Sequence, residues 1–149
     1  MSFCGFYLGC VQISNDREVQ ITRVGSKTTF KWKLKGAPDN STLNFHVFIY
    51  NPRKVEIFTD FYKRNTINTR LYYKKNSQIE KNRTTGYLNL NAGNGILTVN
   101  LYNVRFNDSR VFSLEFFSSS SGSEEMVNNI TLDVQSKSLF NFFIFSKRF

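Results

Sequence analysis

The fold class is decided by residues 28–34, TTFKWKL, where apolar and basic side chains alternate. Phe30, Trp32 and Leu34 fall on one side of an extended chain, and the two lysines between them fall on the other. Successive side chains of a β-strand point to opposite faces, so this period of two is typical of a strand with one buried and one solvated face. The stretch therefore predicts a half-buried strand whose three apolar residues lie in the core.

Further strands of similar length are expected along the rest of the chain. They are residues 45–50, 55–61, 87–90, 96–101, 111–117 and 127–134. Clusters of turn-forming residues lie between them, such as GAPDN at 36–40 and NAGNG at 91–95. About seven to nine short strands, with a turn roughly every ten residues, predict an all-β fold built as an antiparallel β-sandwich.

Length and composition set limits on the class of protein. A chain of 149 residues favours one domain, and 40% hydrophobic residues argue against disorder. No apolar run approaches the ~20 residues that span a bilayer. One histidine and two cysteines disfavour histidine-based metal centres and four-thiolate zinc sites. The sequence also lacks a nucleophile elbow and a phosphate-binding glycine loop, so we expect no enzyme, no metal and no cofactor.

The two ends differ in composition from the middle of the chain. Residues 1–13 are apolar and are interpreted as a possible remnant of a signal peptide, although they lack its basic start. Residues 136–149 form a Phe-rich tail, either an uncommitted appendage or a membrane-surface anchor. The domain is expected to span residues 14–135. Cys4 and Cys10 fall outside it and could pair locally, bond another chain or stay unpaired.

Residues 101–114, LYNVRFNDSRVFSL, carry a second signal. They resemble the segment of immunoglobulin variable-type domains that crosses strands E and F, where a leucine, a valine, an Asp-Ser-Gly turn, a tyrosine and a cysteine recur at fixed spacing. Residues 25–32, GSKTTFKW, are similar to strand B of the same family. The resemblance covers roughly residues 16–135. It implies an immunoglobulin-like, variable-type β-sandwich.

This chain departs from that family at the position of the inter-sheet disulfide. Trp32 and Leu114 stand where the family has its two cysteines. Losing a bridge that closes about 80 residues removes on the order of 4 kcal/mol in the chain-entropy account. Burial of an indole against a leucine contributes a few kcal/mol, roughly, of apolar stabilisation. We therefore expect Trp32 and Leu114 to form a core pair in place of the disulfide.

The corner between strands E and F also differs. Phe112 replaces the family's corner tyrosine, so the hydroxyl-to-backbone hydrogen bond should be missing. The resemblance implies that Asp108 is a structural turn residue that pairs with an arginine. Arg83 is the candidate, although Gly86 and Tyr87 lie closer to the family's position for that arginine.

Variable-type domains without the disulfide suggest a cell-surface role. This chain resembles the outermost domains of carcinoembryonic-antigen and SLAM-type adhesion receptors, and more nearly the allorecognition receptors of colonial cnidarians. The resemblance implies an extracellular recognition or adhesion domain. It also implies a protein partner, a same-type domain on an opposing cell, bound through the C–C′–F–G sheet. An incomplete gene product with no function of its own is the alternative.

The strand at residues 45–50 predicts where such a partner binds. If Phe45, Val47 and Ile49 face the core, aromatic residues face outward, as in many protein interfaces. A slip of one residue would exchange the two sets, and the next strand presents either Glu56 and Phe58 or Val55 and Ile57. The alternative is that both faces are covered within one chain. The expected partner-binding residues are His46, Phe48, Tyr50, Glu56, Phe58, Glu115 and Phe117.

His46 has two interpretations. An ordinary histidine pKa near 6.5 would make it a pH switch, and a solvated position on the sheet would give it no special role.

The charge supports a rival function. The chain carries a net charge of +9, much of it within residues 63–83, so this region is either a polyanion site or a solvated basic surface. A polyanion here would be a heparan-type glycan or a nucleic acid. The basic residues are Lys63, Arg64, Arg70, Lys74, Lys75, Lys81 and Arg83.

Glycosylation triplets begin at Asn40, Asn82, Asn107 and Asn129. Their number is close to what chance would give in a chain this rich in asparagine, serine and threonine. Asn129 should project from the same sheet as the expected interface, where a sugar would obstruct binding.

Overall fold

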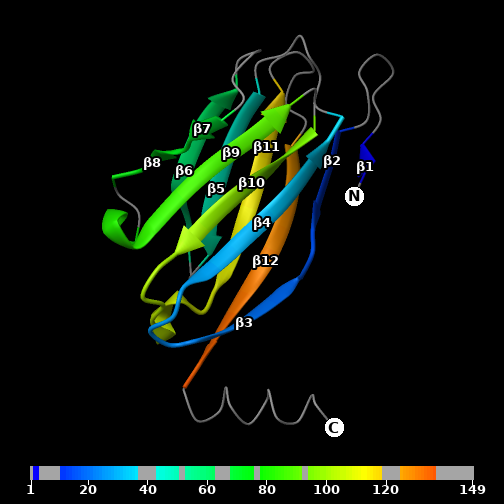
Figure 1. Cartoon of the computed structure of the whole chain (residues 1–149). Helices are drawn as coiled ribbons and strands as arrows, with labels where there is room; N and C mark the ends of the chain where they lie inside the picture. Colours follow the sequence, from blue (N-terminus) through cyan, green and yellow to red (C-terminus); the bar gives the residue numbers. More distant parts are fainter. Residues whose placement is uncertain are drawn as a thin grey trace, which may run out of the picture.

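The computed structural model describes residues 2–3, 11–36, 43–50, 53–62, 68–75, 78–91, 94–118 and 125–136. They form two six-stranded β-sheets packed face to face, with β4, β9 and β10 in front of β5, β11 and β12 in Figure 1. The expected all-β sandwich is therefore confirmed. Neither of the two short 3-10 helices in this part of the chain, η1 (Lys81–Arg83) and η2 (Phe106–Asp108), is long enough to cross a membrane.

Sheet A has the strand order β1-β2-β4-β10-β9-β7. Its strands are β1 (Ser2–Phe3), β2 (Val11–Asn15), β4 (Thr28–Lys35), β10 (Asn94–Leu101), β9 (Thr84–Asn91) and β7 (Asn68–Arg70). Sheet B has the order β3-β12-β11-β5-β6-β8. Its strands are β3 (Val19–Arg23), β12 (Glu125–Gln135), β11 (Val111–Ser118), β5 (Leu43–Tyr50), β6 (Lys54–Tyr62) and β8 (Tyr72–Tyr73). All pairs are antiparallel except β3 with β12, which the sequence did not predict.

The core lies between the sheets and is made by the inward side of each alternating strand. Phe30 of β4 stacks on Phe112 of β11, with ring centroids 4.2 Å apart, and so joins the two sheets. Trp32 and Leu114, two residues further along the same strands, are both 0% exposed and belong to the same cluster. The indole Nε1 of Trp32 is buried without a hydrogen-bond partner in the described part of the chain. An orphaned buried donor costs about 1–3 kcal/mol, which offsets part of the apolar gain.

Strand β2 spans residue 14, the expected start of the domain. Strand β2 pairs with β4 so that Ile13 lies opposite Leu34, and Ile13 is buried in the core. Sequence patterning missed this strand because its short alternation follows directly on an apolar segment. After β2, the chain crosses from sheet A to sheet B and continues as β3. Cys4, Cys10 and residues 137–149 lie outside the described residues.

The corner before β11 contains a buried ion pair. Arg83 Nη2 donates to Asp108 Oδ2, and both side chains are almost fully buried. Asp108 Oδ2 also accepts the backbone N–H of Arg105 at 2.7 Å, while Arg83 Nη1 donates to Glu80 Oε2 at 2.8 Å. Arg83 is thus the arginine that pairs with Asp108. Phe112 is completely buried in this corner.

Candidate functional site

Strand β5 has the phase that its sequence predicted. Phe45, Val47 and Ile49 are buried in the core. The alternate residues are half-buried on the outer face of sheet B, and they are His46, Phe48 and Tyr50. Three aromatic rings therefore follow one another along an interior strand of this sheet, with β11 on one side and β6 on the other.

A cation and a carboxylate lie beside these rings. Lys54 Nζ is 4.1 Å from the centroid of the Phe48 ring, a cation–π distance, and 2.5 Å from Glu115 Oε1. The Tyr50 hydroxyl donates to the same carboxylate oxygen at 3.0 Å. Glu115 thus binds both Tyr50 and the lysine that lies over the Phe48 ring. This arrangement orders the aromatic line, formed by His46, Phe48 and Tyr50, in the unbound domain.

The prediction that Glu115 is an accessible partner-binding residue is wrong. Its side chain points to the outer face, as expected, but is only 1% exposed, with Tyr50 and Lys54 bound to it. Its Oε2 has no hydrogen-bond partner among the described residues. Glu115 therefore positions the residues above it rather than presenting itself to a partner.

The prediction that Phe58 binds a partner is also wrong, because a β-bulge changes which side chains of β6 face outward. Val47 pairs with Phe58 and Phe48 pairs with Glu56, so Ile57 is an extra residue between the two pairs. Phe58 consequently lies on the core side and is 2% exposed, while Ile57 is completely buried. The sequence predicted that either Glu56 and Phe58 or Val55 and Ile57 face outward, and neither pair does so as a whole. Of Glu56 and Phe58, only Glu56 lies on the outer face.

His46 has a carboxylate partner. Its Nδ1 lies 2.5 Å from Glu56 Oε1 and 3.4 Å from Thr59 Oγ1. Lys74 Nζ lies 3.5 Å from the other oxygen of Glu56. The imidazole also stacks on Phe48, with centroids 6.0 Å apart. Polar groups of both charges therefore flank the aromatic line on its β6 side.

On its other side, the face continues to the edge strand β3. Thr131 pairs with both Val19 and Val111, and Val111 pairs with Tyr50, so these four residues form a row across four strands. They line a shallow groove of about 530 Å³, in which Val19 is 55% exposed. The side chain of Phe117 lies outside the described part of the structure. Its backbone pairs with Asn44 and Glu125.

The glycosylation triplets fall in different surroundings. Asn129 is exposed on β12 opposite Ser113, so it projects from the outer face of sheet B as expected. Asn82 and Asn107 are exposed in η1 and η2, outside the strands of sheet B. Asn40 lies outside the described residues.

The described basic residues between positions 70 and 83 are not all accessible. Arg83 is buried in ion pairs with Glu80 and Asp108, which corrects its assignment to a polyanion site. Lys74 lies beside Glu56. Arg70, Lys75 and Lys81 are described as exposed, and Lys63 and Arg64 lie outside the described residues.

Among the described residues, no group of three His, Cys, Asp or Glu side chains could hold a metal ion.

The sequence matches no protein-family model, and no curated protein matches it. Solved structures are similar in fold. A structure of VGSC beta subunits, from work on their multimeric cell-adhesive interactions, has a TM-score of 0.61 at 10% identity over 82% of this chain and 96% of that one. Murine CRIg has a TM-score of 0.60 at 8% identity, covering 84% and 98% of the two chains. The natural killer cell receptor NKp44 has a TM-score of 0.57 at 16% identity, covering 80% and 99%.

These likenesses establish an immunoglobulin-like fold. Sheet B contains strands equivalent to those of the larger sheet in variable-type domains. Strands β6 and β8 extend it beyond the three strands β12, β11 and β5.

Proposed function

We propose that this domain is an extracellular recognition or adhesion domain that binds a second copy of itself through the outer face of sheet B. The observation that carries the proposal is the line of His46, Phe48 and Tyr50, with Lys54 placed 4.1 Å from the Phe48 ring. Aromatic side chains next to a cation are typical of the energetic centre of protein interfaces. The contacts to Glu115 pre-order this centre, which lowers the entropy lost on binding.

The similar structures support a recognition role in general terms. NKp44 is a triggering partner in natural cytotoxicity, and VGSC beta subunits make multimeric cell-adhesive interactions. Because one fold hosts many functions, the chemistry of this face has to carry the assignment. The nearer likeness to cnidarian allorecognition receptors and to carcinoembryonic-antigen and SLAM-type domains stays a prediction from the sequence.

The charges around the aromatic line favour a like partner. A two-fold interface joins the same patch on both copies, so the patch must complement itself. Lys54 and Lys74 lie on the same face as the half-buried Glu56. A two-fold copy can therefore set a lysine of one chain opposite the glutamate of the other, with aromatic rings packed between them.

Bead aggregation tests this proposal. Beads coated with the full chain should aggregate, and Phe48→Glu or Tyr50→Glu should abolish aggregation by placing a carboxylate in the interface centre. Tyr87→Glu is the matched control, because Tyr87 is an exposed aromatic residue of β9 on the outer face of sheet A. Circular dichroism of each variant should show an intact β-sandwich. Aggregation that survives both sheet B variants would remove this face as the interface.

Sedimentation velocity separates a like partner from an unlike one. The purified chain should form dimers as its concentration rises, and Phe48→Glu should remain monomeric. A wild-type chain that stays monomeric up to about 1 mM, where binding is worth only about 4 kcal/mol, would overturn self-association.

A further inference from the structure

The outer face of sheet A carries lysines at every second position of one strand. Lys31, Lys33 and Lys35 project to solvent from β4 because the residues between them fill the core. Their Cα atoms are about 6–7 Å apart along the strand. The result is a ladder of positive charge on the face opposite to the aromatic line of sheet B.

Arg70 extends this charge across the sheet. Lys31 pairs with Thr98, Thr98 with Tyr87, and Tyr87 with Arg70, so these four residues form one row from β4 to β7. Three strand spacings separate Arg70 from Lys31, which is about 14–15 Å. The positive charges therefore border a broad face rather than a single point.

Among the described residues, Asp16 is a carboxylate that lies beside the lysines of this face. Asp16, at the end of β2, hydrogen bonds to Lys33 Nζ at 2.6 Å. Within the described part of the chain, Lys31, Lys35 and Arg70 pair with no carboxylate. The hydrogen bond from Lys33, together with the charges of Lys33, Lys31 and Arg17, holds the pKa of Asp16 below its usual value. The surroundings of Asp16 are thus strongly positive.

The side chains between the charges are polar. Thr29 Oγ1 donates to Asn100 Oδ1 at 2.8 Å, and Asn100 Nδ2 donates to Thr85 Oγ1 at 3.3 Å. Tyr87, which is 46% exposed, and Ile96 are the large apolar side chains exposed on the described part of this face. Thr29, Asn100 and Thr85 therefore form a row of hydroxyl and amide groups across β4, β10 and β9, parallel to the row from Lys31 to Arg70.

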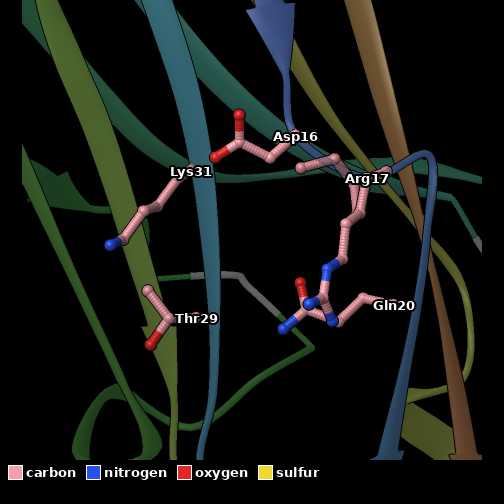
Figure 2. A pocket seen from close by; sticks show the side chains of 6 residues that line it. Asp16, Arg17, Gln20, Thr29 and Lys31 are labelled. Atoms are coloured by element: carbon pink, nitrogen blue, oxygen red, sulfur yellow. The ribbon is translucent and has the colours of Figure 1, made fainter.

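A cleft of about 160 Å³ adjoins this face where the chain leaves β2 for β3 (Figure 2). Lys31 and Thr29 line it from β4, and Arg17 and Gln20 line it from the other side in Figure 2. Gln20 Nε2 donates to Thr28 Oγ1 at 2.5 Å and so joins β3 to β4 at the cleft. Arg17 and Lys31 give the cleft two cations, with Asp16 as its carboxylate.

We propose that the outer face of sheet A, with this cleft at its edge, binds a sulfated polysaccharide. Such a polymer repeats anionic groups among many hydroxyls, which complements unpaired lysines set among hydroxyl and amide side chains. Single-stranded nucleic acid favours successive exposed aromatic platforms, whereas the described part of this face offers the exposed Tyr87 and the half-buried Tyr102, whose ring has Lys27 Nζ 5.2 Å from its centroid. An anionic membrane favours a continuous apolar surface, which Tyr87 and Ile96 do not make. Because this site lies opposite sheet B, it can be occupied together with the proposed protein interface.

Heparin is the probe for this site. Wild-type affinity for heparin should fall linearly with salt on a log–log plot, since binding releases counterions. Lys31→Glu/Lys35→Glu should weaken binding by about tenfold or more near 0.15 M NaCl, and should also lower the salt slope. Lys75→Glu/Lys81→Glu is the matched control with the same net charge, and it should bind within about twofold of wild type. Equal loss in both variants would overturn the assignment to sheet A.

Two further measurements sharpen the test. Asp16→Asn should strengthen heparin binding about twofold or threefold, because it removes the face's carboxylate and frees Lys33. Phe48→Glu should bind heparin like wild type, so failure of the protein interface leaves this result intact. Tighter binding to single-stranded DNA or to phosphatidylserine vesicles than to heparin would overturn the choice of a polysaccharide.

Discussion

The two outer faces of the sandwich use similar residues in different ways. On sheet B, Lys54 directs its charge at Glu115 and the Phe48 ring, and the residues around it are half-buried. On sheet A, Lys31 and Lys35 are exposed, and no described carboxylate pairs with them. The first arrangement is ordered and partly desolvated, which suits a packed protein interface. In the second arrangement the charges are solvated and accessible, which suits a flexible polyanion. Charged residues on a sheet therefore indicate a ligand class only when their partners are known.

Both faces rest on one core, so the largest effect should come from its centre. Trp32→Ala should lower the free energy of unfolding by about 3–5 kcal/mol and weaken both binding activities together. Trp32→Phe should cost much less, because it keeps an aromatic ring and removes the orphaned indole N–H. Urea denaturation measures both values. A Trp32→Ala variant with wild-type stability would contradict the burial of Trp32 at the core.

The corner ion pair should come next. Arg83→Ala leaves Asp108 buried without its main counter-charge and should cost about 3–5 kcal/mol. Lys33→Ala breaks the exposed pair with Asp16 and should cost about 0–1 kcal/mol. The same denaturation experiment compares them. Similar losses from the two variants would mean that the Arg83 pair is solvated.

Glycosylation should separate the two faces. Chain secreted from glycosylating cells with a sugar on Asn129 should lose bead aggregation, because the glycan projects from sheet B, and it should still bind heparin. Asn129→Gln, expressed in the same cells, should aggregate. Mass spectrometry establishes whether the site is occupied. Aggregation by fully glycosylated chain would exclude the β12 side of sheet B from the interface.

The salt dependence of the two binding activities should distinguish the two faces without any mutation. Raising NaCl from about 50 to about 200 mM should reduce heparin affinity by about tenfold or more, because each lysine or arginine that binds a sulfate group of heparin releases counterions. Bead aggregation should change much less, because an aromatic centre depends mainly on apolar burial. Equal salt sensitivity of the two activities would indicate that one charged surface serves both.

The smallest effect concerns acid stability at Glu80. Hydrogen bonds from Arg83, from the backbone and from Arg105 lower the pKa of Glu80 to about 2, from a usual 4.5. A depressed carboxyl pKa stabilises the fold above pH 4.5, and this contribution is lost as the pH falls from 4.5 through about 2. Because Glu80 is about half exposed, Glu80→Gln should reduce that loss by less than about 1 kcal/mol. Urea denaturation at pH 2, 4 and 7 tests the direction, and an unchanged pH dependence would contradict it.

Several features could be predicted from single runs of sequence. The alternation at residues 28–34 predicted which side chains of β4 are buried, and the same reasoning placed His46, Phe48 and Tyr50 on the outer side of β5. These predictions succeed because the side-chain period of a strand is a local property of its backbone. The sequence by itself therefore determined the all-β class and the outward aromatic line.

Only the tertiary structure decided which outward residues are accessible. The bulge at Ile57 turned Phe58 into the core, Tyr50 and Lys54 covered Glu115, and burial beside Asp108 removed Arg83 from the accessible basic surface. Each of these outcomes depends on how one segment is placed against another, through strand register for β5 with β6 and β11 and through a contact between η1 and η2 for Arg83. A shift of one residue in register exchanges the two faces of a strand. Local alternation contains no information about that register, because it is settled when the two sheets pack on a common core.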